Sequence, residues 1–122
     1  MSKTILAVDD SASMRQMIKL TLRNAGYDVI EAGDGQQGLA QMRGGAVHMI
    51  LTDLNMPVMD GMVFIRELRK LPACKGIPIV FVTTESDAEK KSQAKAAGAT
   101  AWITKPFQPE QLVAVARKVL GE

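Results

Sequence analysis

The chain has 122 residues, a length typical of one domain. Fifteen Lys and Arg against thirteen Asp and Glu leave a net charge of +2, too small to indicate nucleic-acid binding through bulk charge. No apolar run approaches the roughly 18 residues that span a bilayer, and the first residues lack the pattern of a signal peptide. Cys74 is the only cysteine, which excludes an intramolecular disulfide. We therefore expect a cytoplasmic single-domain protein that contacts neither nucleic acid nor membrane.

Short apolar segments recur along the chain at regular intervals. They are mostly aliphatic and show little alternation with polar residues, a pattern typical of strands buried on both faces of a parallel sheet. These predicted strands cover residues 4–8, 27–30, 47–51, 77–82 and 101–103.

The segments between them have apolar residues at helical spacing. Four of the predicted helices are marked, in chain order, by Met14, Met17, Ile18 and Leu22, by Leu39 and Met42, by Met62, Ile65, Leu68 and Leu71, and by Leu112, Val115, Ala116, Val119 and Leu120. A further helix is predicted over residues 87–97, before the last of these. In the first helix, Arg15, Lys19 and Arg23 are expected on the opposite, solvated face.

Capping residues mark several helix ends. Ser86 and Glu89 have the spacing of a capping box, and Gly98 suits a C-terminal cap. Pro109 suits the first turn of the last helix, and the Gly pair at 44–45 ends the second.

The resulting order is five repeats of a strand followed by a helix. Parallel strands need crossover connections, and these are almost always right-handed. The sequence therefore predicts an α/β fold: one doubly wound, five-stranded parallel sheet with helices on both faces.

Polar side chains gather where the predicted strands end. Asp9 and Asp10 follow the first strand, Asp53 the third, Thr83 the fourth and Lys105 the fifth. Ligands of such sheets bind at the carboxyl ends of the strands. Carboxylates brought together repel one another, and Mg²⁺ prefers such oxygen ligands. We therefore predict a magnesium site at this edge.

Each of these residues also has an ordinary structural explanation. An Asp after a strand is often only a loop or capping residue, and Thr83 or Lys105 alone could be a strand-end hydroxyl or a solvated lysine. Their coincidence at the same end of four strands favours a functional site. The only histidine, His48, lies at the opposite end of a strand, which argues against a zinc or copper centre.

Over its whole length the sequence resembles the receiver domains of two-component signalling. The residues that carry the resemblance are Asp9-Asp10, Asp53, the loop Met-Pro-Val-Met-Asp-Gly at 56–61, Thr83 and the pair Lys105-Pro106. We expect no output domain, and the chain then resembles the stand-alone, CheY-like members of the chemotaxis type. The resemblance implies a flavodoxin-like (βα)5 fold with strand order 2-1-3-4-5, and a single receiver domain over residues 1–122.

The resemblance also implies a switch rather than an enzyme acting on other molecules. Asp53 would accept a phosphoryl group from a phosphohistidine of a chemotaxis-type sensor histidine kinase and later lose it by autodephosphorylation. Thr83 and Lys105 would hold phosphoryl oxygens, and the Lys105–Pro106 bond would be cis, an isomer that the sequence alone does not reveal.

The metal ligands are implied in the same way. Mg²⁺ would be held by Asp10, Asp53 and the backbone carbonyl of Asn55, with Asp9 acting largely through bound water.

The response is expected on the fourth helix, the fifth strand and the fifth helix, with Thr83 and Trp102 as the switch pair. A downstream target protein would bind there, and the flagellar motor switch is one candidate. The fourth helix carries three lysines, Lys90, Lys91 and Lys95. They argue against binding to the motor and leave another target or a phosphate-sink role open. They also suit a helix face that is simply solvated. We expect a monomer.

Other functions fit the residues less well. A phosphohydrolase with an aspartyl-phosphate intermediate usually has an acid two residues after its nucleophile, where this chain has Asn55, and a cap insertion that is missing here. A flavodoxin-like nucleotide binder needs a phosphate-cradling first loop, where Asp9 and Asp10 would repel phosphate. A pseudo-receiver that only binds partners would lack some of the site residues. Cys74 is expected to be an inert loop thiol.

Overall fold

The predicted alternation of strands and helices is present in the computed structural model, which describes residues 3–44 and 46–122. Within these residues the strands are β1 (Thr4–Val8), β2 (Asp28–Ala32), β3 (Met49–Thr52), β4 (Ile79–Thr83) and β5 (Ala101–Thr104). The helices are α1 (Ala12–Asn24), α2 (Gly35–Gly44), α3 (Gly61–Lys70), α4 (Ala88–Ala97) and α5 (Pro109–Val119), with a 3₁₀-helix, η1 (Pro72–Cys74), after α3.

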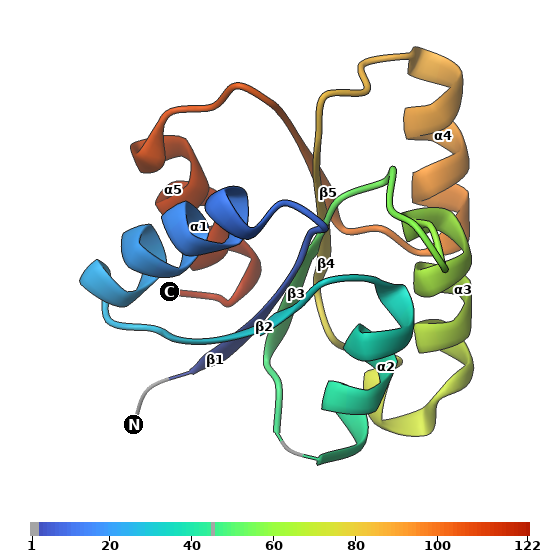
Figure 1. Ribbon diagram of the computed structural model, residues 1–122, viewed down its shortest axis with the longest axis horizontal. Coiled ribbons are helices and arrows are strands. Elements are labelled where there is room, and N and C mark those ends of the chain that lie inside the picture. Colours follow the sequence, from blue (N-terminus) through green and yellow to red (C-terminus); the bar gives the residue numbers. More distant parts are fainter. Residues whose placement is uncertain (1–2, 45) are drawn as a thin grey trace.

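The strands form one parallel sheet in the order β2-β1-β3-β4-β5, with helices on both faces (Figure 1). Alternate residues of each strand enter different cores, as the period of a strand requires. Ile5 and Leu51 pack with α1 and α5, whereas Leu6 and Ile50 pack with α3 on the other face. The predicted doubly wound fold is confirmed.

The bounds of β1 match the prediction, and those of the other strands differ from it by at most two residues. Tyr27 was predicted in the second strand, but its backbone N–H donates to Leu22 O at the end of α1 (3.0 Å) and its side chain lies in the α1–α5 core. Ile77 precedes β4, and Glu31 belongs to β2 rather than following it. The apolar pattern indicates which residues are buried. Burial begins shortly before the first residue that pairs in the sheet, so the second, third and fourth predicted strands begin too early.

The predicted capping box of α4 is wrong. Asp87, not Ser86, is the N-cap, and its carboxylate accepts the Glu89 N–H at 2.8 Å. Two adjacent residues can cap this helix, and the stronger acceptor, a carboxylate, takes the position. The predictions for Gly98, the C-cap of α4, and for Pro109, in the first turn of α5, are confirmed. Gly45, predicted to end the second helix with Gly44, lies outside the described residues.

Among the described residues, no helix is both long enough and apolar enough to cross a membrane.

Candidate functional site

The carboxyl ends of the parallel strands bring the predicted site residues to one edge of the sheet. Asp9 follows β1 directly, Asp53 follows β3, Thr83 ends β4 and Lys105 follows β5. Lys105 is tied to the neighbouring strand, since its backbone N–H donates to Thr83 O at 2.8 Å. The Lys105–Pro106 peptide bond is cis.

Three carboxylates meet at this edge, from Asp9, Asp10 and Asp53, with one oxygen of each within 4.8 Å of the others. They differ in exposure: Asp9 is buried, Asp53 is half-buried and Asp10 is exposed. A hard cation with oxygen ligands, such as Mg²⁺, suits this donor set, and the half-open position leaves room for water or phosphate oxygens to complete its shell.

The Lys105 ammonium bridges two of these carboxylates. Its Nζ lies 2.7 Å from Asp9 Oδ2 and 3.3 Å from Asp53 Oδ2, and the lysine side chain is 11% exposed. Opposite charges this close and this well shielded from water attract more strongly than surface pairs do. The site therefore pairs a cation with its carboxylates before any ligand arrives.

The Asp53 carboxylate is fixed in orientation. Its Oδ1 accepts the Leu54 N–H at 2.7 Å and, more weakly, the Asn55 N–H at 3.4 Å, while Oδ2 points to Lys105. Asn55, two residues after Asp53, is exposed. One face of the Asp53 carboxylate is therefore held by backbone and the other by a cation.

Arg15 is part of the site's surroundings, although the sequence predicted it on the solvated face of α1. Its guanidinium donates to the backbone oxygen of Asp9 and, through Nε, to Glu31 Oε1 at 3.2 Å. Because α1 begins shortly after Asp9, the Arg15 side chain in its first turn reaches the end of β1. The Asp9 side chain in turn accepts the Ser11 N–H at 2.9 Å.

Thr83 connects this edge to Trp102 through Glu85. The buried Thr83 hydroxyl accepts the Glu85 N–H at 3.3 Å, and the Trp102 indole N–H donates to Glu85 O at 3.2 Å. Trp102 is half-buried; its ring centroid lies 5.6 Å from that of Phe81, and Lys91 Nζ lies 5.8 Å from it over the ring. Sequence reasoning did not find this role of Glu85, because its partners are reached through backbone atoms.

The loop after Asp53 has an unusual backbone. Val58 has φ +67° and is 76% exposed, and the Met59 N–H donates to Pro57 O at 2.7 Å across it. A branched residue rarely adopts this left-handed conformation. The loop ends at Gly61, where a Cβ would lie 2.7 Å from the Phe81 ring, so the chain passes too close to β4 for any side chain.

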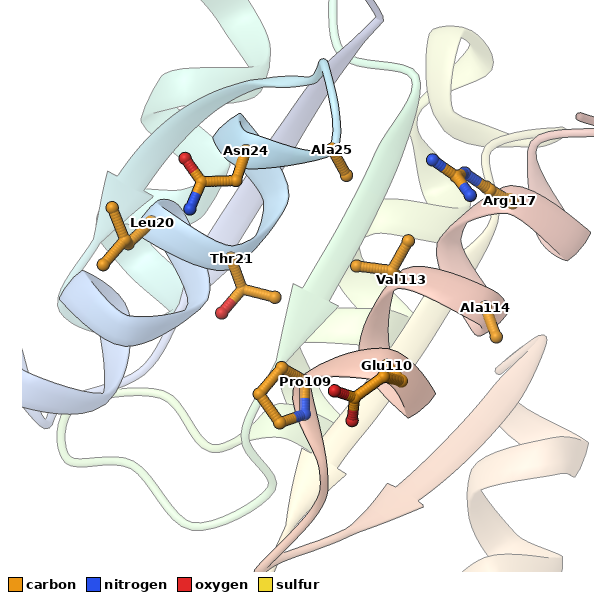
Figure 2. A pocket seen from close by; sticks show the side chains of 9 residues that line it. All are labelled: Leu20, Thr21, Asn24, Ala25, Pro109, Glu110, Val113, Ala114 and Arg117. Atoms are coloured by element: carbon orange, nitrogen blue, oxygen red, sulfur yellow. The ribbon is translucent and has the colours of Figure 1, made fainter.

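A separate groove of about 600 Å³ lies between α1 and α5, away from these carboxylates. Figure 2 shows side chains of both helices around it, among them Leu20, Thr21 and Val113. Leu20 is 63% exposed at its rim, but nothing in the structure shows what covers this groove.

The family model for the response regulator receiver domain matches residues 5–117, including every residue of the carboxylate–lysine cluster. The chain belongs to this family. It is a receiver domain of a phosphorylation-activated response regulator, and receiver domains bind Mg²⁺ through an acidic cluster such as this one.

Similar proteins fall into two groups by length. The chain is 39% identical over 118 residues to the phosphate regulon transcriptional regulatory protein PhoB of Pseudomonas aeruginosa, covering 97% of this chain and 52% of PhoB. It thus spans about half the length of that relative.

The second group has the length of this chain. Chemotaxis protein CheY1 of Helicobacter pylori is 39% identical over 119 residues, covering 96% of each chain. The crystal structure of chemotaxis protein CheY4 of Vibrio cholerae is 44% identical, with a TM-score of 0.94 over 98% of this receiver domain and 99% of CheY4. The predicted family and its CheY-like fold are confirmed.

Proposed function

We propose that Asp53 is the phosphoacceptor of this receiver domain and that a sensor histidine kinase of the chemotaxis type is the donor. The observation that carries this proposal is the Lys105 ammonium held between Asp9 and Asp53 at the carboxyl edge of the sheet. A carboxylate is a competent nucleophile without a general base. An Asp53 oxygen forms a bond to phosphorus while the P–N bond of the donor phosphohistidine breaks and its imidazole leaves.

Lys105 and Thr83 would act on the transferred group. Phosphoryl transfer depends mainly on positioning and on stabilisation of charge on the equatorial oxygens. Lys105 already contacts an Asp53 oxygen, so its ammonium can move to a phosphoryl oxygen with little displacement. The Thr83 hydroxyl accepts one weak bond, from the Glu85 N–H, and this leaves its proton available for donation to another phosphoryl oxygen.

Mg²⁺ would be held by Asp10, Asp53 and the backbone carbonyl of Asn55, and when bound it offsets negative charge on the carboxylates and the phosphoryl group. Asp9 would act largely through bound water. Asp9 is the most buried of the three carboxylates, whereas Asp10 is exposed and Asp53 is half-buried, which supports this more distant role.

The response would involve Thr83 and Trp102 and the surface formed by α4, β5 and α5. Glu85 supports this pairing because it accepts from the Trp102 indole and donates to the Thr83 hydroxyl. Movement of that hydroxyl toward a phosphoryl group breaks the Glu85 bond and changes the environment of the indole.

The two similar chemotaxis proteins of nearly equal length support a chemotaxis-type regulator. We propose in addition that it works as a monomeric single domain in the cytoplasm. We propose that it transfers no phosphoryl group to other substrates and that it loses its own by autodephosphorylation. The flagellar motor switch is one candidate target, and a phosphate-sink role is the alternative.

Intact mass spectrometry tests the central proposal. After incubation with acetyl phosphate and Mg²⁺, the wild-type chain should gain one phosphoryl group, and Asp53→Asn should gain none. Asp34→Asn, which alters an aspartate at the start of α2, serves as the matched control and should behave like wild type. Phosphorylation of Asp53→Asn at the wild-type level would exclude Asp53 as the acceptor.

Beryllium fluoride, a phosphoryl mimic, tests the switch pair. With Mg²⁺ present in all samples, the mimic should change Trp102 fluorescence in wild type, and Thr83→Ala should bind it without that change. An unchanged signal in a wild-type chain that binds the mimic would rule out Trp102 as part of the switch.

A further inference from the structure

Among the residues that the structure describes, Arg69, near the end of α3, donates its hydrogen bonds to backbone carbonyl oxygens alone. Its Nη1 lies 2.6 Å from Cys74 O and 2.8 Å from Ile77 O, in the segment that leads into β4. Its Nη2 lies 2.7 Å from Gly98 O, and its Nε lies 3.3 Å from the same atom. One guanidinium thus joins α3, the start of β4 and the turn after α4.

Gly98 is the C-cap of α4 and packs directly on this guanidinium. It has φ +113°, and a Cβ built on it would lie 2.9 Å from Arg69 Nε. Burial lowers the pKa of Arg69, which is consistent with a cation partly shielded from water. The oxygen that Arg69 holds therefore belongs to the residue at which α4 ends.

The apolar contacts of α4 also lie toward this end. Ala94 is the one residue that α4 buries, and Ala97 and Ala99 pack against the same core as partly buried residues. The C-terminal half of α4 is therefore held both by burial and by the Arg69 hydrogen bonds.

The N-terminal half of α4 is attached differently. The Asp87 N–H donates to Glu85 Oε1 at 3.1 Å, and Lys90 Nζ lies 3.5 Å from Glu85 Oε2. The N-cap Asp87 and the helix residue Lys90 therefore both contact the Glu85 carboxylate. The backbone of the same Glu85 bonds the Thr83 hydroxyl and the Trp102 indole. One end of α4 is bound to α3, and the other end is bound to the candidate switch.

We propose that Arg69 is a positioning residue for the response: it fixes the C-terminal end of α4, so that α4 turns about Gly98 when Glu85 moves. The motion is largest at residues 88–91 and smallest at residues 94–97. This inference rests on the proposed function for the signal at Thr83, but the fixing of Gly98 by Arg69 exists without phosphorylation. Without Arg69, α4 moves or loosens along its whole length. The gradient of motion from residues 88–91 to residues 94–97 then disappears.

Residue-resolved hydrogen exchange tests this on wild type, Arg69→Lys, Arg69→Met and the control Arg66→Met, which removes an exposed arginine from the same helix. Lysine keeps the charge but lacks the planar fork through which Nη1 bonds to Ile77 O and Nη2 to Gly98 O, so its one ammonium nitrogen does not reproduce this arrangement. Without any mimic, the amides of Gly98 and Ala99 should exchange about tenfold faster in both Arg69 variants and at the wild-type rate in Arg66→Met.

Beryllium fluoride and Mg²⁺ are then added. In wild type and Arg66→Met, the change in exchange should decrease from residues 88–91 to residues 94–97. In Arg69→Lys it should extend evenly through residue 97. A purely structural role of Arg69 would speed exchange everywhere, including in β1 and β3, and leave the gradient unchanged.

Several results separate this inference from the proposed function. If the mimic binds and the wild-type change is even along α4, or if Arg69→Lys keeps the gradient, the inference is wrong although the proposed function stands. If the mimic does not bind, the proposed function fails, and the exchange of Gly98 and Ala99 without mimic still decides whether Arg69 fixes this end. Should Arg69→Met fail to fold, Arg69→Lys carries the comparison.

Discussion

Two helices on the same face of the sheet, α3 and α4, have the same length and very different attachments. Each has ten residues. Helix α3 buries Gly61, Phe64, Ile65 and Leu68, whereas α4 buries Ala94 alone. The two helices therefore contribute unequally to stability: α3 is part of the core, and α4 covers its edge.

The composition of α4 explains how it forms with so little burial. Its sequence, AEKKSQAKAA, consists almost entirely of strong helix formers, with a carboxylate at the N-cap and glycine at the C-cap. Local preference and capping thus replace packing. A helix held in this way can shift without loss of the core, which suits the response proposed for this surface.

The largest effect is expected from the core of α3. Phe64→Ala should lower the free energy of unfolding by about 3–5 kcal/mol, because it leaves a cavity under α2 and β1. Gln93→Ala in α4, an exposed position, should change it by less than about 0.5 kcal/mol. Urea denaturation measures both. Similar losses for the two variants would remove the contrast between the helices.

A substitution in the loop that leads into α3 should stabilise the protein. Val58→Asn should raise the free energy of unfolding by about 1 kcal/mol, since asparagine adopts a positive φ more readily than a branched residue. Val63→Asn, an exposed valine inside α3, is the control and should give no gain. A destabilised Val58→Asn would show that this loop is not strained.

The N-cap of α3 should affect the stability of the whole domain, whereas the N-cap of α4 should affect mainly the local stability of that helix. Asp60 accepts the Val63 N–H and Asp87 accepts the Glu89 N–H, so Ala at either position removes one capping bond. We expect Asp60→Ala to cost about 1 kcal/mol of global stability. Asp87→Ala should cost less globally and instead speed exchange within α4. Equal global losses would indicate that α4 unfolds only together with α3.

The smallest effect concerns alkaline pH near η1. Burial raises the pKa of the Cys74 thiol from its ordinary value of 9.0. The folded chain then keeps the thiol proton at pH values where the unfolded chain has released it, so this contribution is complete below about pH 9 and lost as pH rises through the higher folded pKa. Cys74→Ala should flatten the fall in stability above pH 9, measured by urea midpoints; an unchanged slope would contradict this.

The pattern of apolar residues was sufficient to predict the fold, because strands buried on both faces are continuous apolar runs. It was less reliable at the boundaries. Tyr27 and Ile77 are apolar and partly or fully buried but lie outside the strands, since burial extends beyond the paired residues. Cys74, expected in a loop, lies buried in η1.

The clustering of Asp9, Asp53 and Lys105 followed from their positions after parallel strands, and the structure brings them together. Their roles in phosphoryl transfer stay predictions. The contributions of Arg15 and Arg69 were missed, because Arg69 binds backbone oxygens and Arg15 binds the Asp9 backbone oxygen besides the Glu31 carboxylate, and any residue type supplies a backbone oxygen. A sequence pattern shows which side chains are present and leaves such partners open.

The position of Lys105 has a consequence for how the proposed metal binds. A divalent cation that approaches Asp53 meets an ammonium already paired with that carboxylate and with Asp9. Its uptake is then an exchange between two cations rather than a simple association, so the apparent Mg²⁺ affinity includes the work of displacing or sharing the lysine. In the proposed mechanism the same ammonium would turn toward the phosphoryl group when that group arrives, and this would couple weak Mg²⁺ binding before phosphorylation to tighter binding after it.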